Sequence, residues 1–300
     1  MVMCGSARKS RSIAAGAVLG FPQAGDSMQT GRIAEWLAAV RTGLSRFADV
    51  ALPPLCLGCG RGVSAHAALC GACWAGIDFI ERPSPNFNER PEGRRPDILL
   101  LHYTGMASAE AAAARLCDPA AKVSSHYLVD EAGRITRMVP EHLRAWHAGV
   151  GHWAGESDIN GCSIGIEIAN GGHDFGSPPY PDIQMRAVEA LCRDILSRHP
   201  IPPRRVLGHS DIAPGRKADP GEWFDWARLS RAGIGLWVKP EPVIEGPSLN
   251  KGDRGDTVAE LQFMLGDYGY GIEVLGRYDE ATEAVVTAFQ RHFRPERVDG

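Results

Sequence analysis

The stretch DILLLHY, residues 97–103, carries four consecutive apolar side chains and then a histidine. An unbroken apolar run of this length is typical of a strand that is buried in a sheet. His102 falls at the carboxyl end of the run, the edge where α/β sheets tend to hold their ligands. The stretch therefore predicts a buried strand that delivers a histidine to a functional site.

Strands alternate with helices on both sides of this stretch, which indicates an α/β domain. Ser108 is the expected N-cap of the first helix. A short EAG turn joins two strands into a predicted hairpin. The expected elements are a helix at 108–117, a hairpin of 126–130 with 134–138, a strand at 163–168, a helix at 181–199 and a short strand at 204–210.

Composition sets the limits for the rest of the chain. Its 300 residues are enough for two domains or for one domain with small modules. The net charge of −4 provides no general basic field, so a nucleic-acid partner is not expected. No apolar run reaches the roughly 18 residues that a membrane helix needs, so no membrane span is expected. The oligomeric state is not indicated.

Shifts in composition divide the chain into six expected segments. Stretches rich in proline and charged residues are predicted to be linkers between folded parts. The expected segments are a disordered leader at 1–27, a helix with a cysteine-rich unit at 28–82, a linker at 83–95, the α/β domain at 96–235, a linker at 236–246 and a small helical unit at 247–300.

Four of the eight cysteines form two Cys-x-x-Cys pairs, Cys56 with Cys59 and Cys70 with Cys73. Paired knuckles of this spacing place four thiolates around one structural zinc ion. Disulfides or free thiols are the alternative. The surrounding segment resembles the N-terminal zinc ribbon of the ComF family of phosphoribosyltransferase-like proteins. The phosphate-cradling loop of those transferases has no match here, so phosphoribosyl transfer is not implied.

The loop GHSDIAPGRKADPG, residues 208–221, follows the last predicted strand. It could be an ordinary solvated loop. However, His209 and Asp219 in this loop, together with His102, are a ligand set that suits a catalytic zinc ion with one open position. Zinc can activate water and polarise a carbonyl group.

Five ordered motifs resemble the zinc-dependent N-acetylmuramoyl-L-alanine amidases of the AmpD/AmiD type: LLLHYTG, VSSHYLVDEAGRITRMVP, RAWHAG, NGCSIGIEIAN and VLGHSDIAPGRKADPG. The resemblance implies a mixed central sheet flanked by helices and zinc ligands at His102, His209 and Asp219. It also implies that Glu167 is the general base and that Lys217 stabilises the oxyanion. An exposed sheet-edge glutamate and a solvated loop lysine are the alternatives for these two residues.

Three further residues are candidates for the substrate groove. His147 and Trp146 lie in RAWHAG, and Tyr127 lies in SHYLV. Core packing is an equally good explanation for Trp146 and Tyr127. Cysteines 117, 162 and 192 are expected to be core thiols.

The C-terminal unit at 247–300 resembles the small helical peptidoglycan-binding domain that accompanies such amidases. The matching residues are KGDRGDTVAELQ and the later T..AV..FQ pattern. The unit lacks the usual Asp-Gly before its aromatic residue and stops at VDG, so an incomplete domain is expected.

The resemblance implies hydrolysis of the amide between the lactyl group of N-acetylmuramic acid and L-alanine, with peptidoglycan or muropeptides as partner. The alternative is a module of the same fold that recognises peptidoglycan without cleaving it. One catalytic and one structural zinc ion are expected. A four-cysteine ribbon favours the reducing cytoplasm, whereas a wall-binding domain favours the periplasm or cell wall. We expect the cytoplasm.

Overall fold

The computed structural model describes residues 79–242 and 248–300. The chain separates into two compact units, 1–53 and 54–300, and every described residue belongs to the second unit. The predictions for the leader, for the helix that follows it and for the four ribbon cysteines lie outside the described residues.

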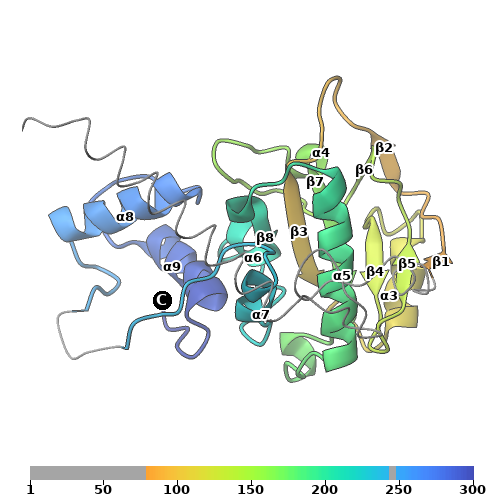
Figure 1. Cartoon of the computed structure of the whole chain (residues 1–300). Coiled ribbons are helices and arrows are strands. Elements are labelled where there is room, and N and C mark those ends of the chain that lie inside the picture. The colour runs from red at the N-terminus through yellow and green to blue at the C-terminus, as the bar shows by residue number, and fades with distance from the viewer. Residues whose placement is uncertain (1–78, 243–247) are drawn as a thin grey trace, which may run out of the picture. The chain divides into compact units, whose positions relative to one another are not determined.

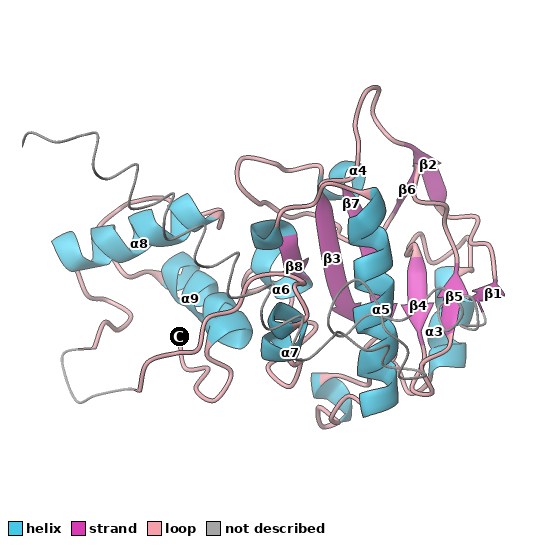
Figure 2. Cartoon of the chain, in the orientation of Figure 1, coloured by secondary structure: helices cyan, strands magenta, loops and turns pink. Residues whose placement is uncertain are grey.

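A six-stranded sheet forms the centre of the structure (Figures 1 and 2). Its four neighbouring strands β4, β7, β3 and β8 run parallel, whereas β5 runs antiparallel to β4 and pairs in parallel with β1. The prediction of a mixed sheet is therefore confirmed. In spatial order the strands are β1 (Phe79–Glu81), β5 (Ile135–Arg137), β4 (Tyr127–Val129), β7 (Ser163–Ile168), β3 (Ile98–Tyr103) and β8 (Val206–Gly208).

Helices and short turns connect these strands. Ser108 caps the first helix as predicted, because its hydroxyl oxygen accepts a hydrogen bond from the backbone N–H of Ala111 at 3.2 Å. None of the described helices is long and apolar enough to cross a bilayer. The elements are α3 (Ala109–Leu116), α4 (Ile159–Cys162), η1 (His173–Phe175), α5 (Asp182–Arg198), η2 (Pro203–Arg205), α6 (His209–Ile212), α7 (Trp226–Arg231), α8 (Asp256–Tyr268) and α9 (Glu280–Phe293).

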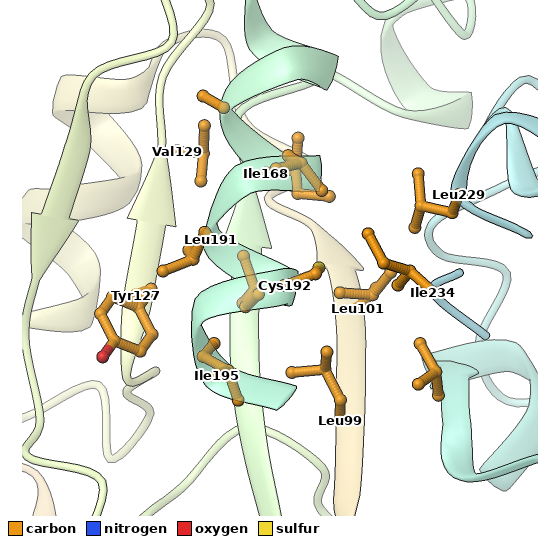
Figure 3. Packing of buried hydrophobic residues seen from close by; sticks show 14 of the residues in the cluster. Leu99, Leu101, Tyr127, Val129, Ile168, Leu191, Cys192, Ile195, Leu229 and Ile234 are labelled. Carbon is orange, nitrogen blue, oxygen red and sulfur yellow. The ribbon is translucent and has the colours of Figure 1, made fainter. Parts of the chain in front are cut away.

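Strand β3 is buried on both faces, which explains its unbroken apolar sequence. Leu99 and Leu101 pack on one face against α5 (Figure 3). Ile98 and Leu100 belong to a second cluster on the other face, which also contains Ile212 of α6. Because side chains alternate along a strand, His102 lies on the same face as Ile98 and Leu100.

The register of β3 and β7 brings two of the predicted site residues side by side. In this parallel pair His102 lies opposite Glu167. Ile166 and Ile168 of β7 pack in the cluster with α5, so Glu167 points to the opposite face. The carboxyl ends of two neighbouring strands therefore carry the first histidine and the candidate base on one face of the sheet.

The C-terminal helices α8 and α9 contribute to the second hydrophobic cluster, and α9 packs against α6. Their side chains share a hydrophobic core with the central strands and with α6, and the buried members from the C-terminal segment are Leu265, Tyr270, Val285 and Ala288. The helical periodicity that the sequence shows at 258–265 and 285–293 corresponds to α8 and α9. The C-terminal unit is therefore joined to the α/β domain through α6 and this shared cluster (Figure 1).

The segment 83–95, expected to be a linker, is instead integrated into the domain. It forms β2 (Phe87–Glu89), which pairs antiparallel with β6 (Leu143–Ala145). Arg90 follows β2 and donates hydrogen bonds to backbone carbonyl oxygens, at 2.9 Å to Gly161 and 2.8 Å to Ser163. Burial lowers the pKa of Arg90 to about 10. The charged composition that predicts a solvated linker thus supplies a half-buried arginine that binds backbone carbonyl groups of the domain.

We expect Arg90→Met to lower the free energy of unfolding by about 3 kcal/mol, because several buried carbonyl groups would lose their only donor side chain. The measurement is urea unfolding followed by circular dichroism. Arg95→Met is the matched control, since Arg95 lies in the same segment but is exposed. Equal unfolding midpoints for the two variants would contradict a structural role for Arg90.

Candidate active site

Three ligand atoms converge at the carboxyl end of the central strands. The Nδ1 atoms of His102 and His209 lie 2.9 Å apart, and Asp219 Oδ2 lies 3.0 Å and 3.1 Å from them, respectively. All three side chains are buried, with at most 5% of each residue exposed. His102 is the penultimate residue of β3, His209 begins α6 after β8, and Asp219 lies on the loop that follows. Within the described residues, this triad is the one cluster with metal-ligand geometry.

The triad fits a tetrahedral zinc ion. With bonds of about 2.0 Å, ligand atoms of a tetrahedral zinc lie roughly 3.3 Å from one another, close to the observed triangle. Two imidazole nitrogens and one carboxylate oxygen are a donor set that zinc accepts in catalytic sites, where three protein ligands leave the fourth position open. Two lone pairs facing each other at 2.9 Å would repel in the absence of a cation. The residues present therefore fit a zinc ion.

Hydrogen bonds to the outer ring nitrogens orient both histidines. His209 Nε2 donates to the carbonyl oxygen of Ala148 at 2.8 Å. His102 Nε2 lies 3.0 Å from His147 Nδ1, and His147 Nε2 lies 3.3 Å from the hydroxyl of Ser163. If each Nε2 carries its proton, both Nδ1 lone pairs face the centre of the triad. Hydrogen-bond partners at the outer ring nitrogen fix the tautomer and raise the basicity of a metal-ligating histidine.

His147 therefore lies behind His102, a candidate zinc ligand, and it also lines the cavity, where the sequence suggests a place in the substrate groove. It lines the cavity but is buried against β7, where the backbone of Gly165 makes room for it. A Cβ atom at Gly165 would come within 2.6 Å of the His147 ring. The structure thus assigns His147 mainly to the support of His102.

Electrostatics favour the protonation states that a metal site needs. Burial, together with the charge of His209, lowers the pKa of His102 to about 4, so its ring is neutral at pH 7. Burial alone would raise the pKa of Asp219, but the adjacent imidazole rings of His209 and His102 hold it below its ordinary range. A neutral imidazole and an ionised carboxylate are the forms that bind metal.

Glu167 lies beside the triad, opposite His102 in the sheet. Among the described residues, none donates a hydrogen bond to its carboxyl group. Burial and the charge of Asp219 raise the pKa of Glu167 to about 8, and the positive charge of Lys217 opposes this shift. A carboxyl group with an elevated pKa in a cavity is a candidate for proton transfer.

The triad and Glu167 open into a cavity of about 520 Å³. Lys217 is exposed on the loop that carries Asp219 and lines this cavity. Trp146 also lines it, and its indole N–H donates to Asn88 Oδ1 of β2 at 2.6 Å. The cavity is therefore flanked by a cation on one side and by an anchored aromatic ring on another.

Tyr127 does not line this cavity, so its assignment to the substrate groove is corrected. It is the first residue of β4 and belongs to the core cluster (Figure 3). Its hydroxyl donates to Glu141 at 2.8 Å. The three cysteines expected to be core thiols are free, with Cys162 and Cys192 buried and Cys117 half-buried.

Sequence reasoning missed several residues that line the cavity. Tyr103 follows His102, and its hydroxyl lies 3.0 Å from Nδ1 of His173. The other ring nitrogen of His173, Nε2, lies 3.1 Å from a carboxylate oxygen of Glu222. Arg115 and Arg216 add positive charge to the rim. The GGHDFG and PGRKADPG motifs contain His173 and Arg216, but no spacing rule shows that these two residues line the same cavity.

Three family models match the chain. The model described as N-acetylmuramoyl-L-alanine amidase matches residues 92–222. A double zinc ribbon domain matches 47–85, and a peptidoglycan binding domain matches 254–300. The zinc ribbon and the peptidoglycan-binding unit that the sequence indicates are therefore confirmed as domain types.

Individual relatives agree with the first model. The chain is 33% identical over 252 residues to the N-acetylmuramoyl-L-alanine amidase AmiD of Escherichia coli, an alignment that covers 79% of this chain and 90% of the relative. It is 36% identical to the 1,6-anhydro-N-acetylmuramyl-L-alanine amidase AmpD of Escherichia coli, covering 49% of this chain and 87% of the relative.

A solved structure agrees as well. The complex of Escherichia coli AmiD with anhydro-N-acetylmuramic acid-L-Ala-D-gamma-Glu-L-Lys superposes with a TM-score of 0.57 at 33% identity, over 71% of this chain and 91% of that chain. The three-ligand cavity, the order of the sheet and these matches lead to one conclusion: the chain belongs to the N-acetylmuramoyl-L-alanine amidase family.

Proposed function

We propose that the chain hydrolyses the amide between the lactyl group of N-acetylmuramic acid and L-alanine, with a zinc ion held by His102, His209 and Asp219. One observation carries the proposal: the three ligand atoms converge within 3.1 Å at the floor of a cavity that Glu167 also lines. The relative solved with an anhydro-muropeptide supports muropeptides as the substrate class.

A zinc ion bound there would supply Lewis acidity toward the scissile carbonyl and the attacking water. The chain's own residues then supply positioning and proton transfer. His147 keeps the Nδ1 lone pair of His102 directed inward. No described residue donates a hydrogen bond to the Glu167 carboxyl group, and a cation held at the triad would lower its raised pKa again. The carboxylate could then take a proton from the attacking water and return it to the leaving amine of L-alanine.

Lys217 supports the same reaction from the loop that also carries Asp219. Its ammonium group lies on an exposed loop that lines the cavity, where negative charge develops on the amide oxygen. A cation placed near that oxygen stabilises the tetrahedral transition state more than the ground state. Trp146 and the rim arginine Arg115 are proposed to contact the glycan or the stem peptide, because both line the cavity without contacting the triad.

A non-catalytic recognition module is the alternative from the same fold. Recognition alone would need neither buried metal ligands nor an unpaired carboxyl group beside them. Burying such groups costs free energy unless a partner compensates for it. The presence of the full triad together with Glu167 and Lys217 in one cavity therefore favours catalysis.

His209→Ala should remove zinc from the cavity and abolish hydrolysis, because two remaining ligands hold the metal too weakly. The measurements are zinc per chain by elemental analysis and L-alanine-terminated peptides released from soluble muropeptides. His173→Ala is the control for metal content, since His173 lines the same cavity but lies outside the triad. Unchanged zinc content in His209→Ala would refute the triad.

Glu167→Gln should keep the fold and the zinc but lower the rate of amide cleavage by ~10²–10⁴-fold. This loss corresponds to a barrier increase of roughly 3–5 kcal/mol. The readout is peptide release measured by mass spectrometry on sacculi and on muropeptides. Glu110→Gln makes the same charge change on the surface and should have the parental rate. A zinc-replete Glu167→Gln protein with the parental rate would end the assignment of the base.

The proposal includes a second zinc ion, held by Cys56, Cys59, Cys70 and Cys73. The double zinc ribbon match at 47–85 supports it. Changing Cys56 and Cys59 to Ser should reduce the zinc content from two ions to one per chain and leave amide cleavage largely intact, since the matches for the two sites lie apart in sequence. Elemental analysis that still finds two ions in this variant would count against the ribbon site.

We place the protein in the cytoplasm as part of this proposal, because a four-thiolate ribbon keeps its metal best in a reducing compartment. A peptidoglycan-binding domain fits the periplasm equally well. Fractionation of cells with detection of the full chain distinguishes the two compartments.

A further inference from the structure

Asp211, two residues after the ligand His209, is held by side chains of the C-terminal unit. Its two carboxyl oxygens accept hydrogen bonds from the hydroxyl of Tyr270 at 2.7 Å and from His292 Nδ1 at 2.8 Å. It also accepts the backbone N–H of Gly208 at 2.8 Å. Asp211, Tyr270 and His292 are each at most 2% exposed. Side chains from outside the α/β domain thus hold, through hydrogen bonds, the short helix α6 that begins with His209.

The His292 ring is fixed by packing as well as by this bond. It stacks on Trp226 of α7 with centroids 3.8 Å apart and on Phe293 at 4.2 Å. Its Nε2 atom has no hydrogen-bond partner among the described residues. The bond from Nδ1 to Asp211 is therefore the polar contact that orients this buried ring.

The helix α9 reaches the ligand-bearing segment at two further places. Gly215 lies so close to α9 that a Cβ atom built on it would be 3.2 Å from the Cβ of Ala284. Arg291 forms an ion pair with Glu222 at 3.6 Å, and Glu222 accepts the ring N–H of His173 on the rim of the cavity. The contacts at Asp211, Gly215 and Glu222 are thus distributed along the segment that carries His209, Lys217 and Asp219.

The segment itself has little regular structure to hold its shape. The helix α6 is a single turn, and residues 213–221 form no strand. Its internal backbone bonds include those from Lys217 N to Ala213 O and from Ser210 N to Asp219 O. A loop with few internal bonds takes its geometry from the surfaces against which it packs. Here one of these surfaces is α9.

We infer that the C-terminal unit is a positioning element of the metal site: His292 and Tyr270, acting through Asp211, hold α6 so that His209 meets His102 and Asp219. This role is additional to any binding of peptidoglycan by the unit. It rests on the proposed zinc triad. Neither His292 nor Tyr270 touches a ligand atom, so both act through Asp211.

The test uses the full chain with Tyr270→Phe and His292→Leu combined, which removes both hydrogen bonds but keeps most of the buried volume. We expect the zinc affinity of the triad to fall about tenfold, as is usual when outer-shell partners are lost. The affinity is measured by competition with a chromogenic chelator, and His209→Ala protein titrated in parallel identifies the zinc of the ribbon. The visible spectrum of the cobalt-substituted protein should also change, because it reports ligand geometry.

Two controls separate positioning from general stability. Val285→Ala opens a cavity in the same interface without touching Asp211, so it should lower the melting temperature but not the zinc affinity or the cobalt spectrum. His292→Asn keeps a donor at the position of Nδ1 and should restore most of the affinity. If the double variant is isolated unfolded, Tyr270→Phe alone carries the same comparison.

The outcomes are distinguishable. A folded double variant with parental zinc affinity and cobalt spectrum would overturn the inference, and so would an equal loss of zinc affinity in Val285→Ala. A parental protein that holds no zinc removable by His209→Ala would instead overturn the proposed zinc triad.

Discussion

The burial of Asp219 is the constraint on which the rest of the site depends. A carboxylate that is only 5% exposed loses most of its hydration and must be compensated by nearby positive charge or by donors. Two imidazole nitrogens lie within 3.1 Å of it, but neutral rings with inward lone pairs cannot neutralise it. A divalent cation between the three atoms satisfies the carboxylate and both rings at once. The surrounding structure can therefore be understood as the support of one cation site.

Two distant parts of the chain must meet for this site to form. His102 and Asp219 are separated by 117 positions and come together because β3 pairs directly with β8. The alternation of side chains then decides which residues of β3 and β7 face the ligand loop, and the register sets Glu167 beside His102. A shift of one residue in either strand would move one of these two side chains into the core with α5.

Much of this architecture is predictable from local sequence. The apolar run before His102, the capping serine before α3 and the ordered motifs each indicate their element through short-range patterns, and the structure agrees with them. The segment that contains Arg90 is different. Its proline and charge content is typical of linkers, and the carbonyl groups that Arg90 binds lie 51 to 73 positions away in the chain. No local pattern reports such a contact.

The same limit applies to residues whose surroundings depend on tertiary packing. The motif that contains His147 places it near the site but does not say whether it faces substrate or a metal ligand; that depends on the space left by Gly165 in a neighbouring strand. An aromatic residue in a hairpin, such as Tyr127, can point to either face of a sheet. The contact of His292 with Asp211 joins two matched domains, so neither domain's own sequence pattern contains it.

The residues that line the cavity form a buried wall around the triad and an open wall at its exposed rim, and the two walls serve different purposes. On the buried wall every ligand ring has a hydrogen-bond partner behind it, and packing from β7 and α9 removes freedom of movement. On the open wall Lys217, Arg115 and Arg216 are exposed, and their side chains can adjust to a substrate. A zinc site needs fixed ligand geometry, whereas a glycan with an attached peptide needs a surface that tolerates variation. Substitutions on the buried wall should consequently act on metal binding, and those on the open wall on the choice and affinity of substrate.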